Sequence, residues 1–153
     1  MTPDFAKLDC SVARTLEVVG ERWSLLIIRD ALYGVRRFED FQSDLGIARN
    51  ILTERLRKLV EQGVLERVAY EERPPRYEYR LTDKGRDLMP VLLTMMVWGD
   101  KWYPGEMGRP VTWTHTTCGH ETTPTVVCSS CGEELKRRDL RPEPIPIKLK
   151  NPA

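Results

Sequence analysis

Hydrophobic side chains recur at helical spacing in four stretches of the first half of the chain, and a glycine follows each stretch. The predicted helices are 11–19, 23–33, 37–45 and 48–62, followed by Gly20, Gly34, Gly46 and Gly63. Ser11 is a candidate N-cap for the first helix. The second helix is apolar on most sides and should be buried. Gly63 lies where a left-handed C-terminal cap is expected.

Two β-prone runs follow, at 64–70 and 77–81. The turn-rich segment between them contains Pro74 and Pro75, so we predict a hairpin with a stiff, extended tip. Thr82 then provides a candidate cap for one long helix over 83–102.

This order of helix, helix, short helix, glycine turn, amphipathic helix, hairpin and long helix is typical of a winged helix-turn-helix. The predicted fold class is therefore mainly α with a small β-hairpin (α+β), in a domain spanning 8–104. A linker rich in glycine and proline is expected at 105–111. After it we predict a short zinc-ribbon-like β module at 112–142 and a Pro/Lys-rich tail at 143–153.

Composition narrows the class of protein. The 153 residues are 41% hydrophobic and 31% charged, which is typical of globular domains. The formal net charge of +1 means that any basic, DNA-facing surface must be local. The strongly apolar run 89–98 is far shorter than the roughly 20 residues of a membrane span, and the N-terminus lacks the apolar core of a secretion signal. We therefore expect a cytoplasmic protein with no membrane partner.

Double-stranded DNA is the partner that the predicted fold favours, because the second helix of the motif enters the major groove. That helix is 48–62, and the hairpin would be the wing. The candidate contacts carry the donors and acceptors that bases and phosphates require. They are Arg36, Arg37, Arg49, Asn50, Thr53, Arg57, Arg73 and Arg76. The alternative for each is an ordinary solvated charge or polar group.

Several short motifs occur in order along this domain. They are Cys10, Gly20 to Arg29 (GERWSLLIIR), Arg37-Phe38, Leu52 to Leu56 (LTERL), Gly63, Pro74 to Tyr79 (PPRYEY) and Leu81-Thr82. Through them, residues 10 to about 103 resemble the HxlR family of bacterial-type winged-helix transcriptional regulators, relatives of the MarR group. The resemblance implies a homodimer, built mainly from the first and last helices, that binds a pseudo-palindromic operator. The apolar excess of 83–102 independently favours a partner surface, although this helix could instead pack on its own linker and tail.

Cys10 matches a position at which family members resemble redox or electrophile sensors. A helix N-terminus favours the reactive thiolate, whereas the neighbouring Asp9 opposes it. The alternative is a small, inert residue buried at the dimer interface. An oxidant, an electrophile or another small molecule is therefore the expected class of effector.

Two turns of the C-terminal module share the pattern of a ligand, two residues, a cysteine and a glycine. Their candidate ligands are His115 and Cys118 in one turn and Cys128 and Cys131 in the other. Four nitrogen and sulfur donors suit a structural, tetrahedral Zn²⁺, and a module with so little apolar mass needs such a staple. His120 is the alternative fourth ligand, although the spacing favours His115. The turns could also persist without metal, or Cys128 and Cys131 could oxidise as a pair.

The leading functional interpretation is a sequence-specific, DNA-binding transcriptional regulator of the HxlR type. The alternative is a protein-interaction adaptor that uses the winged helix and the zinc-ribbon-like module without specific DNA binding. We expect no enzyme, because four protein ligands leave no coordination position for a catalytic water and no βαβ pattern accompanies the C-x-x-C motif.

Overall fold

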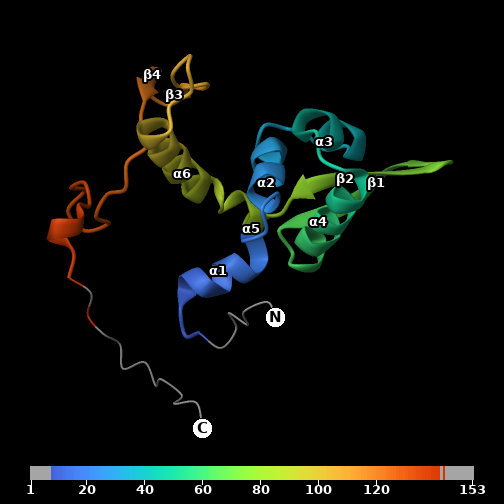
Figure 1. Ribbon diagram of the computed structural model, residues 1–153, viewed down its shortest axis with the longest axis horizontal. Helices are drawn as coiled ribbons and strands as arrows, with labels where there is room; N and C mark the ends of the chain where they lie inside the picture. The colour runs from blue at the N-terminus through green and yellow to red at the C-terminus, as the bar shows by residue number, and fades with distance from the viewer. Residues whose placement is uncertain (1–7, 142, 144–153) are drawn as a thin grey trace, which may run out of the picture. The chain divides into compact units, whose positions relative to one another are not determined.

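The computed structural model describes residues 8–141 and 143, and its contacts divide the chain into two compact units between Met89 and Pro90. The first unit is a winged helix-turn-helix, as the order of its elements predicts (Figure 1). Its elements are α1 (Ser11–Val19), α2 (Ser24–Leu32), α3 (Phe38–Leu45), α4 (Arg49–Glu61), β1 (Leu65–Glu72), β2 (Pro75–Leu81) and α5 (Asp83–Arg86).

The core of this unit is centred on α4. Leu52, Leu56 and Leu59 recur at i, i+4 and i+7 and are fully buried. Helix α4 packs against α1, α2, α3 and β1. Phe41 of α3 and Ile27 of α2 are also fully buried. The face of α4 opposite its buried leucines is therefore left for solvent or a ligand.

The predicted left-handed glycine after α4 is confirmed at Gly63, and Gly46 ends α3 in the same conformation. Gly46 adopts φ +60° and Gly63 φ +68°, in the left-handed region that glycine enters without steric cost. The predicted cap at Ser11 is wrong, because Ser11 is already the first helical residue and Cys10 is the N-cap. The Ser11 hydroxyl instead accepts a hydrogen bond from Arg14 Nη2 at 2.9 Å.

The β1–β2 hairpin, hereafter the wing, reaches beyond α3 and α4 (Figure 1). Its antiparallel register runs from Leu65↔Leu81 to Glu72↔Pro75. The expectation of an extended turn over 71–76 is therefore wrong, since only Arg73 and Pro74 lie between the strands. Cross-strand pairing continues to the tip, where Arg76 Nε lies 3.3 Å from Glu71 Oε2.

The predicted long helix 83–102 is two helices, α5 and α6 (Met89–Trp102). Pro90 explains the break, because it has no amide hydrogen and its ring would clash with the carbonyl four residues earlier in a continuous helix. Proline is tolerated in a first turn, which is where Pro90 lies in α6. The predicted cap at Thr82 is confirmed, since Gly85 N donates to its hydroxyl at 3.2 Å.

The second unit contains α6, the short antiparallel strands β3 (Trp113–His115) and β4 (His120–Thr122), and the 3₁₀ turn η2 (Arg137–Asp139). A bridge between Val127 and Glu134 closes a further turn. Apart from Glu143, the predicted tail lies outside the described residues. Of the helices that are described, none is long and apolar enough to cross a membrane.

Candidate nucleic-acid interface

The exposed face of α4 carries the residues that the sequence predicts for base and phosphate contacts. Arg49, Asn50, Thr53 and Arg57 are all exposed, and Asn50 and Arg57 lie opposite the buried leucines. The Thr53 hydroxyl donates to the Arg49 carbonyl at 2.8 Å, and its oxygen keeps a lone pair for a further donor. The exposed side of α4 therefore presents two guanidinium groups, an amide and a hydroxyl, together with the carboxylate of Glu54.

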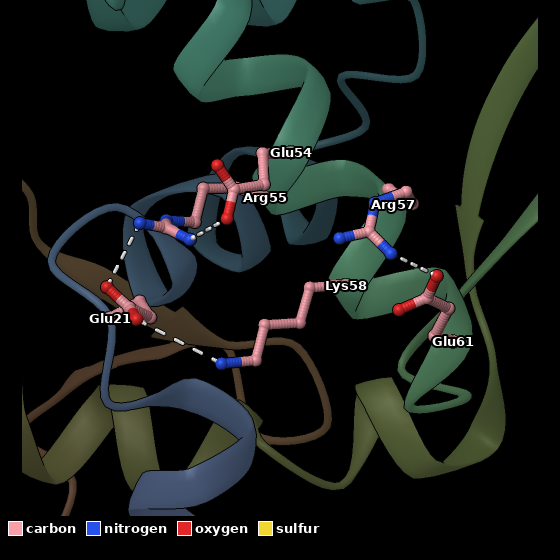
Figure 2. Close-up of polar contacts among 6 residues, drawn as sticks. All are labelled: Glu21, Glu54, Arg55, Arg57, Lys58 and Glu61. Atoms are coloured by element: carbon pink, nitrogen blue, oxygen red, sulfur yellow. Dashed lines mark hydrogen bonds and ion pairs between the residues drawn. The ribbon is translucent and has the colours of Figure 1, made fainter. Parts of the chain in front are cut away.

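Two other cations of α4 do not belong to this face. Arg55 Nη2 lies 3.0 Å and Lys58 Nζ 4.0 Å from the carboxylate of Glu21, in the loop between α1 and α2. Figure 2 shows both side chains directed toward Glu21, whereas Arg57 is directed along the helix toward Glu61. Arg55 and Lys58 thus attach α4 to the rest of the unit, and only Arg49 and Arg57 are presented outward.

Arg57 makes an i,i+4 ion pair with Glu61. Both side chains are more than half exposed, so the pair contributes little to stability, roughly 0.3–0.5 kcal/mol. A phosphate can compete for Arg57 at low cost. Glu61 nevertheless reduces the positive potential at this end of the face.

A hollow of about 660 Å³ lies where the N-terminal ends of α3 and α4 face the wing. Four arginines line it, and we call it the wing hollow: Arg37, Arg49, Arg67 and Arg76. Three of them lie over aromatic rings, with guanidinium-to-centroid distances of 5.0 Å for Arg37 over Tyr70, 4.7 Å for Arg49 over Phe38 and 3.6 Å for Arg67 over Tyr77. Such stacking leaves the edges of the guanidinium groups able to donate hydrogen bonds to an anion.

Two acids, Glu39 and Asp40, also line the wing hollow. The four guanidinium groups outnumber these two acids and Glu71, which pairs with Arg76, so the local charge is positive although the whole chain is near neutral. An extended phosphodiester backbone is a ligand that this combination of cations and aromatic rings suits.

Sequence reasoning missed Arg67, Tyr70 and Tyr77 of this hollow. The register supplies the reason for Tyr70: Ala69 pairs with Tyr77 and Glu71 with Arg76, so Tyr70 is the extra residue of a β-bulge. A bulge changes the direction of a side chain, and the Tyr70 ring at this bulge stacks on Arg37. The alternation of side chains along paired strands could have placed Arg67 and Tyr77 on one face of the hairpin. The predicted turn was too long, which gave the wrong pairing between the strands, so this shared face was not recognised.

The remaining predicted contacts lie apart from the wing hollow. Arg36 lines a separate hollow with Arg80 and Arg86, and its carbonyl accepts a hydrogen bond from Tyr79 N at 2.8 Å. Arg73 is exposed at the tip of the wing. The structure therefore gathers Arg37, Arg49 and Arg76 but not Arg36 or Arg73.

The predicted sensor residue, Cys10, is exposed and is the N-cap of α1. Its neighbour Asp9 pairs with Arg14, with Oδ1 and Nη1 3.2 Å apart. The thiol is accessible to a small reagent in the single chain.

Each C-terminal turn brings its own ligand pair together. In the first, His115 Nδ1 lies 3.3 Å from Cys118 Sγ, and Gly119, at φ +74°, donates to the His115 carbonyl at 2.7 Å. The alternative ligand His120 lies opposite His115 in the β3–β4 register.

The second turn repeats this geometry, because Gly132, at φ +76°, donates to the Cys128 carbonyl at 2.8 Å. The backbone N–H groups of Cys131 and Ser130 point at the Cys128 sulfur and lower its pKa below the usual value. Within the described part of the chain, no three histidine, cysteine, aspartate or glutamate side chains are close enough to hold one metal ion. The four predicted ligands are thus present as two separate pairs.

The family model described as HxlR-like helix-turn-helix matches residues 18–107. The HTH-type transcriptional regulator Rv3095 of Mycobacterium tuberculosis is 50% identical over 136 residues, which are 89% of this chain and 86% of that protein. A match of that length must extend into the residues beyond 107, so the likeness includes part of the C-terminal module.

Solved structures of transcriptional regulators are also similar to this chain. The crystal structure of PA1607, a candidate transcription factor, superposes with a TM-score of 0.80 at 39% identity, over 92% of this chain and 99% of that one. The redox regulator HypR in its oxidised form gives a TM-score of 0.56 at 36% identity, over 60% of this chain and 96% of that one.

Proposed function

Because the chain belongs to the HxlR-like helix-turn-helix family, we propose that it binds a specific duplex DNA site through α4 and the wing. It is an HxlR-type transcriptional regulator and not an enzyme. The observation that carries the proposal is the set of four arginines in the wing hollow, beside the exposed polar face of α4. DNA binding implies action in the cytoplasm, where bacterial DNA is found.

In the proposed complex, Asn50 and Thr53 face base edges in the major groove, because amide and hydroxyl groups read bases there. Arg49 and Arg57 contact bases or phosphates at the two ends of this face. Arg37, Arg67 and Arg76 bind the phosphodiester backbone that runs beside the wing. Arg73, at the tip, reaches the next stretch of backbone or the minor groove.

We further propose that two copies of the chain associate and place two α4 helices on a pseudo-palindromic operator. The support is an apolar stripe on α6 formed by Val91, Met95, Trp98 and Trp102, which recur at i, i+4, i+7 and i+11. Trp98 and Trp102 are 58% and 62% exposed in the single chain. Monomeric proteins rarely expose contiguous apolar patches of this kind, and a two-fold interface would cover it.

The signal that controls DNA binding is proposed to be an oxidant or electrophile that reacts at Cys10. The exposure of this thiol supports the proposal, as does the likeness to a redox regulator. Replacement of Cys10 by serine should leave DNA binding intact and abolish its loss under hydrogen peroxide.

We also propose that the two C-terminal turns supply one structural Zn²⁺ with His115, Cys118, Cys128 and Cys131. The donor chemistry and the matched glycine turns support this, although the two pairs must approach each other to complete a tetrahedral site. The ion would tie the turns together, as a core does in a larger module.

The DNA-binding proposal is tested by fluorescence anisotropy with upstream-region and random-sequence duplexes over a salt series. Wild type should prefer one upstream fragment, and Arg49→Ala/Arg57→Ala should lower the slope of log K against log salt by about 2. Arg14→Ala/Arg138→Ala removes the same charge elsewhere and should change little. If wild type shows no salt-dependent DNA binding up to tens of micromolar, roughly the range of non-specific affinity, the adaptor function replaces this one.

A further inference from the structure

Another hollow, of about 250 Å³, lies within the second unit between the C-terminal half of α6 and the segment that carries β3 and β4. We call it the α6 hollow. Its apolar wall is formed by Leu93, Met96, Val97, Val111, Trp113 and Pro124. Neither the DNA-binding face nor the four predicted metal ligands contribute to it.

The α6 hollow and the apolar stripe lie on different faces of one helix. Leu93, Met96 and Val97 line the hollow, whereas Met95 and Trp98 belong to the exposed stripe. Burial of the stripe in a dimer would therefore not by itself fill the hollow. Met95 belongs to the stripe and Met96 lines the hollow, so their methyl signals can distinguish binding at the two surfaces.

Charged groups stand at the edge of this apolar wall. Arg109 and Lys101 line the hollow together with a single acid, Asp100. Lys101 Nζ lies 5.1 Å from the centre of the Trp102 ring, and Arg109 makes no ion pair with any described residue. An apolar cleft with a few convergent polar groups is the usual form of a small-molecule site.

We propose that the α6 hollow binds a small molecule with one aromatic ring and a carboxylate. The ring would occupy the apolar wall, and the carboxylate would accept hydrogen bonds from Arg109. The size fits, because a cavity of about 150 Å³ accommodates benzene and the larger volume here leaves space for a short acidic arm. This ligand site goes beyond DNA binding and does not depend on it.

The test is a titration of the full-length protein, labelled with ¹³C at the methionine methyl groups, with 3-phenylpropionate. The Met96 methyl signal should shift saturably, with a Kd on the order of 1 mM for so small a ligand. The Met95 signal should move little. The neutral 3-phenylpropionamide, which has the same shape, should bind about five-fold more weakly because it lacks the charge-assisted hydrogen bond.

Variants identify the carboxylate partner. Arg109→Gln should abolish the preference for the acid over the amide, whereas Arg138→Gln, a matched change elsewhere in the unit, should preserve it. Asp100→Asn removes the opposing charge and should tighten binding of the acid a few-fold.

The proposal would be overturned if the Met96 signal showed no saturable shift with 3-phenylpropionate up to about 20 mM, which is well above the expected Kd. A Met95 shift as large as that of Met96 would also overturn it, as would an unchanged preference of Arg109→Gln for the acid over the amide. Because the readout contains no DNA, these results are independent of whether the chain binds an operator.

Discussion

The Nη2 atom of Arg55 in α4 lies 3.0 Å from Oε2 of Glu21, in the loop between α1 and α2. The Arg55 side chain is only 16% exposed, and its Nε is buried without a hydrogen-bond partner. Glu21 compensates the charge of this arginine, together with the more exposed Glu54, whose Oε1 lies 3.4 Å from Arg55 Nη1. The pair fixes the inner side of the helix whose outer side is proposed to bind DNA.

Glu21→Gln should lower the free energy of unfolding by about 1 kcal/mol, because it leaves the largely buried Arg55 without its main counter-charge. The partial exposure of Glu21 keeps the effect below that of a fully buried pair. Urea unfolding measures it. Glu61→Gln, which breaks the exposed pair with Arg57, should cost less than about 0.5 kcal/mol. Equal losses in the two variants would contradict a structural role for Glu21.

Glu61→Gln should at the same time tighten DNA binding about two- to five-fold at low salt. The change frees Arg57 and removes a negative charge beside the phosphates. Anisotropy titrations at two salt concentrations would show the gain shrinking as salt rises. The double variant Arg57→Ala/Glu61→Gln should lose most of the gain. Retention of the full gain without Arg57 would mean that Glu61 acts only through its own charge.

Trp98→Glu should shift the chain from dimer to monomer, because it places a charge in the centre of the apolar stripe of α6. Sedimentation velocity measures the change directly. Met107→Glu is the matched control, since Met107 is 99% exposed and lies outside the stripe. A wild-type chain that sediments as a monomer at micromolar concentration would refute the dimer.

Cys128 should remain a thiolate at lower pH than an ordinary thiol, because the N–H groups of Cys131 and Ser130 stabilise its charged form. The folded pKa lies below the unfolded one, so the associated stabilisation is present above the unfolded pKa and is lost as pH falls through the folded pKa. The pH profile of iodoacetamide alkylation, in metal-free protein with Cys128 as its single cysteine, measures this. A profile identical to that of glutathione, or one unchanged by urea, would exclude the effect.

Purified protein should contain about one zinc ion per chain if the four ligands assemble as proposed. Elemental analysis gives the content, and Co²⁺ substitution gives the ligand-field spectrum of a tetrahedral sulfur site. Cys128→Ser should reduce the content sharply, and Cys10→Ser should not. His115→Ala and His120→Ala identify the fourth ligand. Metal-free protein that retains no Co²⁺ would reject the zinc site.

Local patterning was sufficient to predict α1 to α4, the presence of a hairpin and the exposed residues of α4. Apolar spacing determines which face of a helix is buried, and glycines such as Gly46 and Gly63 end helices through their own backbone freedom. These are properties of short segments, so the winged helix-turn-helix order followed from the sequence. The length of the wing was mispredicted because pairing across the strands outweighed the local preference for a turn. The break at Pro90 was mispredicted because the missing amide hydrogen of proline outweighed the helical preference of its neighbours.

The sequence by itself determined the order of elements and the residue types on the exposed face of α4, because both depend on spacing within one segment. Only the tertiary structure decided that Arg55 and Lys58 attach α4 to Glu21 while Arg49 joins Arg37, Arg67 and Arg76 in the wing hollow. The cations look alike along the chain. Their roles differ because partners from other segments, a carboxylate in one case and aromatic rings in the other, are brought to them by folding.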